Sequence, residues 1–228
     1  MKNFAFTLAE VLITLAIIGV VAAMTIPSLI QANKAHRLRS QFLKSYSTLQ
    51  QAFRQMIDDE VSIDPKTYNN NTFYKTLKNY FKIAIDCGNY QSNSEIKNRK
   101  GCYNKKNDNK KYRTLNNKTD AYTEDLDDGQ FVLMDGTSLL LENASTSLIM
   151  VSVDLNGFNN PPNRWGYDLF SFQLLDGEIK AMGEPKTRYT SLETYCNLKS
   201  TNIRNGIACA SLAKNNSDYF KWVVKNAK

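Results

Sequence analysis

The chain has 228 residues, of which 42% are hydrophobic and 11% aromatic, and its formal net charge is +7 at pH 7. This length accommodates an anchor helix and one globular domain of ordinary size, and it excludes a second domain the size of an enzyme. The mean hydropathy is negative although the first thirty residues are very apolar, so the rest of the chain is polar and a polytopic membrane protein is excluded.

The N-terminal segment is apolar from residue 6 to residue 30 except for one charge, Glu10. Residues 11–30 supply the roughly 20 apolar residues that a helix needs to cross a bilayer core. A carboxylate inside such a helix costs about 2.5 to 3.5 kcal/mol on insertion scales, so it needs a partner or a purpose. A secretory signal cleaved near residues 21–23 is one interpretation, but only Lys2 precedes the apolar run and an acid inside it is unusual. A plain membrane anchor is a second interpretation, and it leaves Glu10 unexplained.

A third interpretation comes from residues 5–10, which read AFTLAE and are followed by a long apolar run. This motif resembles the N-terminal processing motif of type IV prepilins and type II secretion pseudopilins. The resemblance implies that a prepilin peptidase cuts between Ala5 and Phe6, that the new amine of Phe6 is N-methylated, and that Glu10 guides filament assembly. The family usually has glycine immediately before the cut, and Ala5 is a small substitute for it.

The two charges of this motif explain each other. A positive amine on Phe6 and a negative Glu10 would each be costly alone in an apolar filament core, and buried opposite charges are tolerated when they are paired. We therefore expect an ion pair between neighbouring subunits, which sets their register.

The residue pattern together with the resemblance gives an expected organisation for the whole chain. The expected fold is α+β and pilin-like, with a long N-terminal helix packed on a C-terminal antiparallel sheet. Residues 1–5 are the expected leader peptide, 6–30 the transmembrane part of the helix, 31–60 its amphipathic continuation and 61–228 the globular head. The expected partners are other pilin or pseudopilin subunits, prepilin peptidase, an inner-membrane assembly platform and, before assembly, membrane lipid. The expected location is the bacterial inner membrane, crossed once, with the head periplasmic or extracellular.

The long helix is expected to run to about Glu60. Pro27 falls where many pilins have a helix-kinking proline, and because proline removes a backbone hydrogen bond, a kink or a locally melted turn is expected between residues 19 and 27. Beyond the apolar segment, one stripe recurs at three- and four-residue steps, and we expect it to pack on the head; a partner-binding coiled coil is the alternative. The stripe consists of Leu38, Phe42, Tyr46, Leu49, Phe53 and Ile57.

The head begins with turn-forming proline and asparagine near residues 64–71, after which a short helix is expected at residues 72–85. A loop rich in lysine and asparagine follows, and between Lys97 and Lys118 it has nine basic residues against one acid, Asp108. Clustered cations with interleaved tyrosines can bind phosphate backbones and stack on bases, so DNA or another polyanion is one expected ligand, and a solvated loop is the alternative. The candidate anion patch consists of Lys97, Arg99, Lys100, Lys105, Lys106, Lys110, Lys111 and Arg113.

The C-terminal half reads as β-strands. Residues 131–134 and 138–141 flank the turn Asp135-Gly136, and residues 168–175 and 179–182 flank the turn Asp176-Gly177, so two hairpins are predicted. A further β-prone run lies at residues 148–153. The sheet is expected to have about four strands. Residues 218–224 form either a terminal strand or a short helix that closes the head.

A loop rich in oxygen ligands lies between these strands at residues 154–168. Calcium binds six to eight oxygens, and a loop that begins Asp-x-Asn-Gly can turn side chains and carbonyls toward a cation. Asp154, Asn156 and Asp168 are therefore candidate calcium ligands. The alternative is a turn-rich loop pinned by Trp165, because a bidentate glutamate twelve residues from Asp154 is missing.

Four cysteines lie in two clusters and allow three pairings. Nearest-neighbour bridging is the simplest, so we favour Cys87 with Cys102 and Cys196 with Cys209. A zinc site would need closer pairs such as C-x-x-C. Disulfides require an oxidising compartment, which places the head outside the cytoplasm.

The sequence favours a structural subunit over an enzyme. His36 is the single histidine, a glycine-rich phosphate loop is missing, and the cysteines are assigned to bridges. The filament is either a secretion pseudopilus or a surface pilus. The alternative of another class is a membrane-anchored monomer whose head binds an extracellular ligand.

Overall fold

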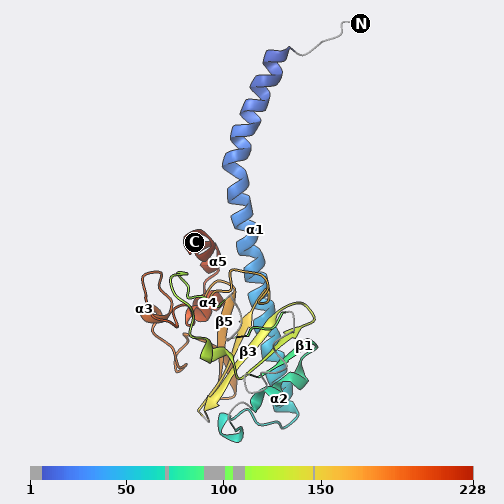
Figure 1. Ribbon diagram of the computed structural model, residues 1–228, viewed down its shortest axis with the longest axis vertical. Helices are drawn as coiled ribbons and strands as arrows, with labels where there is room; N and C mark the ends of the chain where they lie inside the picture. Colours follow the sequence, from blue (N-terminus) through green and yellow to red (C-terminus); the bar gives the residue numbers. More distant parts are fainter. Residues whose placement is uncertain (1–6, 70–71, 90–100, 105–110, 146, 228) are drawn as a thin grey trace.

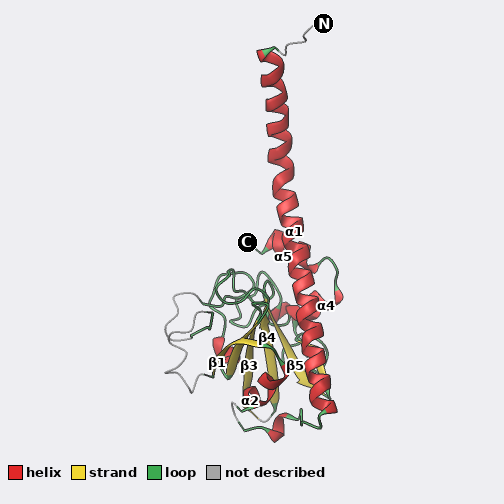
Figure 2. Cartoon of the chain, turned by 90° about the vertical axis from the view of Figure 1, so that its right-hand side faces the viewer, coloured by secondary structure: helices red, strands yellow, loops and turns green. Residues whose placement is uncertain are grey.

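A computed structural model describes residues 7–69, 72–89, 101–104, 111–145 and 147–227. Helix α1 (Leu8–Asp58) is 51 residues long, or about 75 Å at 1.5 Å per residue. Its first half projects alone from the head, and its second half lies along the head (Figures 1 and 2). The prediction of one long helix leading into an α+β head is confirmed.

The second half of α1 packs on the head through one face. Its buried residues are Ala35, Leu38, Phe42, Ser45, Leu49, Ala52, Phe53 and Met56. The predicted stripe is thus confirmed at four positions, and Tyr46 is half-buried. Ile57 was wrongly included, since it is 46% exposed and Met56 takes the inner place. Met56 lies two turns beyond Leu49, whereas Ile57 is displaced by a further 100° or so around the helix.

The head contains a six-stranded antiparallel sheet in which the strands follow their order in the chain. The strands are β1 (Ile83–Gly88), β2 (Gly129–Leu133), β3 (Ser138–Ser145), β4 (Leu148–Asp154), β5 (Leu169–Leu175) and β6 (Glu178–Ala181). Both predicted hairpins are confirmed. Gly136 and Gly177 have positive φ angles of 87° and 79° in their turns, a conformation that glycine adopts without strain.

Two expectations are corrected here: the helix expected at residues 72–85 is shorter, and the sheet expected to have about four strands has six. Helix α2 (Phe73–Leu77) and the 3₁₀ turn η2 (Lys78–Tyr80) end early, and the following residues form β1. Ile83 and Ile85 pair with Leu133 and Val132 of β2, so a partner distant in sequence decides this segment. The described residues also form the 3₁₀ turns η1 (Pro65–Thr67) and η5 (Thr123–Leu126).

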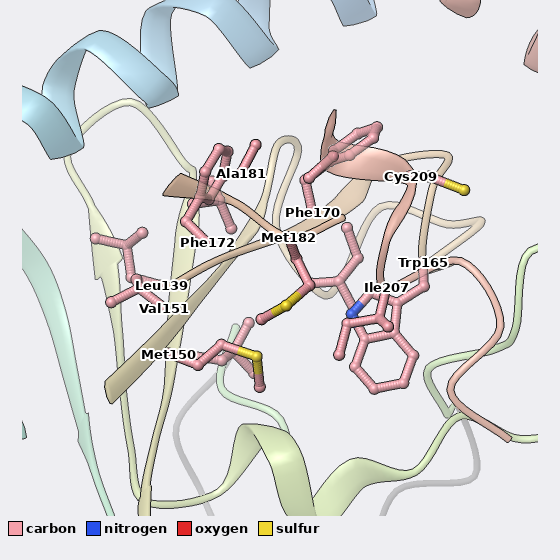
Figure 3. Packing of buried hydrophobic residues seen from close by; sticks show 14 of the residues in the cluster. Leu139, Met150, Val151, Trp165, Phe170, Phe172, Ala181, Met182, Ile207 and Cys209 are labelled. Carbon is pink, nitrogen blue, oxygen red and sulfur yellow. The ribbon is translucent and has the colours of Figure 1, made fainter. Parts of the chain in front are cut away.

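The chain ends in three short helices, α3 (Leu192–Tyr195), α4 (Cys209–Asn215) and α5 (Tyr219–Asn226). The C-terminal segment is therefore a helix, one of the two predicted alternatives. α4 and α5 both contact α1, and Phe42 of α1 meets the rings of Phe170, Phe172 and Phe220 at centroid distances of 4.9, 5.8 and 5.7 Å. Figure 3 shows Phe170 and Phe172 directed toward the helices and Met150 directed toward the opposite face of the sheet. These aromatic contacts attach α1 to the sheet.

Candidate functional site

The first half of α1 presents apolar side chains to its surroundings. Leu8 is 78% exposed, Ile17 59% and Ile30 61%. Among the described residues, α1 is the helix long and apolar enough to cross a membrane, and its most apolar stretch has no buried residue. An apolar surface of this size calls for lipid or another protein chain around it.

Glu10 lies in the first turn of this exposed helix and helps to begin it. Its Oε2 accepts the backbone N–H of Thr7 at 2.8 Å and the Thr7 hydroxyl at 2.9 Å, while the Thr7 hydroxyl oxygen accepts the Glu10 N–H at 3.3 Å. This reciprocal arrangement is a capping box with Thr7 as the N-cap. Ala5 and Phe6, the predicted cleavage and methylation residues, lie outside the described residues, directly before the cap.

Pro27 lies inside α1, and the helix is continuous on both sides of it. The expectation of a locally melted turn at residues 19–27 is therefore wrong, because these residues are helical throughout. Figure 1 shows α1 as a gently curved helix. A kink at Pro27 stays a prediction.

Both predicted disulfides are confirmed. Cys87 bridges to Cys102 with a Cα–Cα distance of 5.7 Å, and Cys196 bridges to Cys209 with a distance of 5.1 Å. The first bridge ties β1 to the segment after it, and the second ties the start of α4 to the end of α3. Each bridge closes a local loop in the head and leaves α1 outside the covalent link.

The predicted calcium loop contains two buried carboxylates, Asp154 and Asp168. One oxygen of Asp154 accepts the Tyr112 hydroxyl at 2.9 Å, and the other accepts the Gly157 N–H at 3.0 Å. Asp168 accepts the N–H of Arg164 at 2.6 Å through one oxygen and a second backbone N–H at 3.0 Å through the other. Both carboxylates thus organise the backbone of their own loop.

The same two groups are poorly placed for negative charge. Burial, followed by the nearby charge of Asp168, raises the pKa of Asp154 to about 8. Burial also raises the pKa of Asp168 to about 6, although the backbone N–H groups that it accepts act in the opposite direction. Asn156 Oδ1 is buried and has no hydrogen-bond partner. The structure brings the predicted ligands into one loop, and calcium binding stays a prediction.

Trp165 pins this loop, as the alternative interpretation expects. Its side chain is fully buried and its indole N–H donates to the Ser171 hydroxyl at 3.1 Å. Gly206 passes so close that a Cβ on it would lie 2.4 Å from the Trp165 carbonyl oxygen, and its φ is +111°. The loop is therefore held from two sides of the head.

Most of the predicted anion patch lies outside the described residues, namely Lys97, Arg99, Lys100, Lys105, Lys106 and Lys110. The two described members are both engaged with Asp120. Arg113 forms an ion pair with it, and Lys111 Nζ lies 3.6 Å from its Oδ2. Binding of DNA or another polyanion stays a prediction.

The sequence interpretation missed a cluster of carboxylates at the entry to β2. Oxygens of Asp127, Asp128 and Glu142 lie within 4.8 Å of one another. The register of β2 against β3 brings them together, and a pairing of this kind is unreadable before the register is known. Asp128 Oδ2 accepts the Asn143 N–H at 2.6 Å, so part of this cluster serves the hairpin itself.

Comparison with known proteins agrees with the N-terminal geometry. A family model described as the prokaryotic N-terminal methylation motif matches residues 1–26, which include Ala5, Phe6 and Glu10. The search of curated proteins and the search of solved structures give no match.

The N-terminus therefore carries the type IV prepilin-type cleavage and methylation motif. Together with the long apolar helix, this motif fits a pilin or pseudopilin anchored in the membrane by a single pass. It implies association with other pilin subunits and processing by prepilin peptidase, and it suggests a structural subunit without enzymatic activity.

Proposed function

We propose that this protein is a filament subunit that is cut between Ala5 and Phe6, N-methylated on Phe6 and polymerised through the first half of α1. The observation that carries the proposal is an exposed apolar helix with a single acid in its first turn, within the matched motif. Before assembly the bilayer covers this helix, and after assembly the helices of neighbouring subunits cover it.

The charge of Glu10 has a specific task in this scheme. After cleavage, Phe6 carries a positive amine at the end of an apolar helix, and each charge alone is costly in an apolar surrounding. When Glu10 of one subunit forms an ion pair with the Phe6 amine of its neighbour, each charge compensates the other and this cost is removed. Subunits in other registers leave both charges unpaired, so the pair selects the register.

The test replaces Glu10 by glutamine in the full chain, expressed with a prepilin peptidase and an assembly platform. Glutamine keeps the capping box, because its amide oxygen accepts from Thr7 as the carboxylate does. Only the charge is lost. The matched control is Glu193→Gln, since Glu193 is another exposed acid in the first turn of a helix, α3.

Two measurements separate processing from assembly. Mass spectrometry of the N-terminus reports cleavage and methylation, and electron microscopy of sheared filaments reports polymerisation. We expect Glu10→Gln to be processed and to form at least tenfold fewer filaments than the parent or Glu193→Gln. Equal filament yield from Glu10→Gln contradicts the proposed pairing, and a parent chain that is processed and stays monomeric supports the anchored ligand-binding alternative.

The filament is either a pseudopilus that serves protein secretion or a surface pilus. Both use the same N-terminal chemistry. Cells that lack the gene distinguish these two tasks. Loss of a secretion pseudopilin leaves exported proteins inside the cell, whereas loss of a surface pilin removes filaments from the cell exterior.

A further inference from the structure

Helix α5 lies beside α1 at the point where α1 leaves the head. A groove between them is lined by residues of both helices, among them His36 and Arg39 of α1 and Phe220 and Lys221 of α5. Figure 1 shows α5 and the C-terminus at the end of the head nearest to the projecting half of α1. α5 is therefore a helix of the head that lies close to the apolar segment.

The side chains at this junction are basic. Arg37 and Arg39 on α1 and Lys221 and Lys225 on α5 are exposed, and we call these four residues the basic collar. The sequence has no acid between Glu10 and Asp58 and none after Asp218.

Asp218 is an acid beside the collar. It forms an ion pair with Lys221, with a distance of 2.9 Å between Lys221 Nζ and Asp218 Oδ1. Its pKa is lowered mainly by Lys221 and to a smaller extent by Arg39. With four cations against this one acid, the collar keeps an excess of positive charge.

The collar also carries an aromatic ring of the kind that favours membrane interfaces. Trp222 is 38% exposed. Lys221 and Lys225 are four residues apart and therefore share one side of α5, and Trp222 lies next to that side. Tryptophan and lysine combine an apolar body with a polar tip and are enriched where a bilayer meets water.

The distances fit a membrane surface. Arg39 lies nine residues beyond Ile30, the end of the apolar segment, or about 13 Å along the helix. Bilayer headgroups occupy several ångströms on each side of the hydrocarbon core, and charges act over a Debye length of about 8 Å. In the proposed topology the collar follows the span on the side away from the cytoplasm, so the positive-inside rule does not account for it.

We propose that the basic collar and Trp222 dock the head on the membrane surface by binding the headgroups of anionic phospholipids before assembly. The docked head holds α1 at a fixed depth and orientation. The inference depends on membrane anchoring from the proposed function but not on polymerisation.

The test places one copy of the full-length protein in each lipid nanodisc, made from phosphatidylcholine alone or from phosphatidylcholine with phosphatidylglycerol. Hydrogen exchange of residues 219–226 is the first measurement. Quenching of tryptophan fluorescence by lipids brominated near the headgroup is the second, and it reports Trp222 because Trp165 is fully buried.

We expect exchange in α5 to slow and tryptophan quenching to rise in anionic discs, with both effects lost at high salt. The variant Lys221→Gln with Lys225→Gln removes most of the effect, since each basic residue near an anionic surface is worth about fivefold in binding. The matched control is Lys66→Gln with Lys75→Gln, which removes the same charge from η1 and α2 at the remote end of the head (Figure 1).

Equal exchange and equal quenching in the two kinds of disc overturn the proposal. So does competition by free glycerol phosphate at low concentration, which indicates a site for small anions. Protection of α5 that appears only when two copies share a disc overturns it in favour of a contact between copies. Filaments that depend on Glu10 while α5 stays unprotected in anionic discs refute this inference alone and leave the proposed function intact.

Discussion

The two halves of α1 form one continuous helix in opposite surroundings. The first half exposes large apolar side chains such as Leu12 and Ile17, whereas the second half buries Phe42 and Leu49 in the core of the head. Both halves are helical, so they differ only in what packs against them. The second half has its partner within the same chain, while the first half obtains one from lipid or from other copies. Variants that affect one half and spare the other test this division.

The largest contrast is expected between Phe42→Ala and Ile17→Ala. Phe42 is fully buried among three phenylalanine rings, so its truncation leaves a cavity and lowers the free energy of unfolding of the head by about 3–5 kcal/mol. Ile17 is 59% exposed, and its truncation changes that free energy by less than about 0.5 kcal/mol. Denaturant unfolding of the full chain in detergent, followed by near-ultraviolet circular dichroism, measures both. Equal losses would show that the first half also packs on the head.

Removal of a disulfide is expected to have the next largest effect. Each bridge closes a loop of similar length, so Cys196→Ala with Cys209→Ala lowers the stability of the head by about 3 kcal/mol. Because α4 contacts α1, hydrogen exchange should rise in residues 35–56 and stay unchanged in residues 8–30.

The matched control for this experiment is Cys87→Ala with Cys102→Ala. This bridge holds β1, and its loss should cost a similar free energy while loosening β1 in preference to α1. Faster exchange throughout residues 8–30 in either variant would contradict the independence of the first half.

A pH dependence is expected for the stability of the head. The pKa of Asp154 is about 8 in the folded protein against an ordinary value of 3.8, so the unfolded chain is more ionised between these values. The contribution of this group to stability therefore falls as the pH rises from about 4 to about 8, by at most about 1.4 kcal/mol per pH unit. Asp154→Asn removes the charge, so it should flatten this slope and stabilise the head at pH 8.

The same measurement tests calcium. Thermal unfolding with a chelator should show the falling slope, and added calcium should raise the melting temperature at pH 8 if Asp154 and Asp168 are ligands. Identical melting with calcium and with chelator contradicts the metal site. A stability that rises between pH 5 and pH 8 in the chelator contradicts the raised pKa.

The smallest effect is expected at the exposed ion pair between the packed half of α1 and the β2–β3 turn. Lys44 Nζ lies 2.6 Å from Asp135 Oδ2, and the side chains are 63% and 36% exposed to solvent, respectively. Although burial acts in the opposite direction, the hydrogen bonds from Lys44 and Thr137 lower the pKa of Asp135, so the pair stabilises at neutral pH and is lost as the pH falls through that pKa. A double-mutant cycle with Lys44→Ala and Asp135→Ala should give a coupling of about 0.2–1 kcal/mol that disappears in high salt. A coupling that persists in high salt would refute this account.

Local patterns in the sequence predicted the features that local chemistry decides. The helix, its packed stripe, the two hairpins with glycine turns and the nearest-neighbour disulfides all follow from spacing or turn residues. Strand β1 was missed because residues 83–88 become a strand through pairing with β2. Ile57 was misassigned because the buried face of α1 recurs about two turns after Leu49, and the residue at that position is Met56.

The sites divide in the same way. The processing motif is contiguous, so the sequence predicted Glu10 and its surroundings directly. The basic collar combines Arg37 and Arg39 of α1 with Lys221 and Lys225 of α5, two segments that come together only when α5 packs against α1. Nothing in either segment alone predicts this surface.

The structure of filaments grown from the full chain tests the central claim most directly. Electron cryomicroscopy should find the first half of α1 in the filament core and the Glu10 carboxylate within about 4 Å of the Phe6 amine of a neighbouring subunit. A filament in which this half of α1 lies outside the core, or in which Glu10 faces solvent, would contradict the claim that α1 assembles the protein through its unpartnered half.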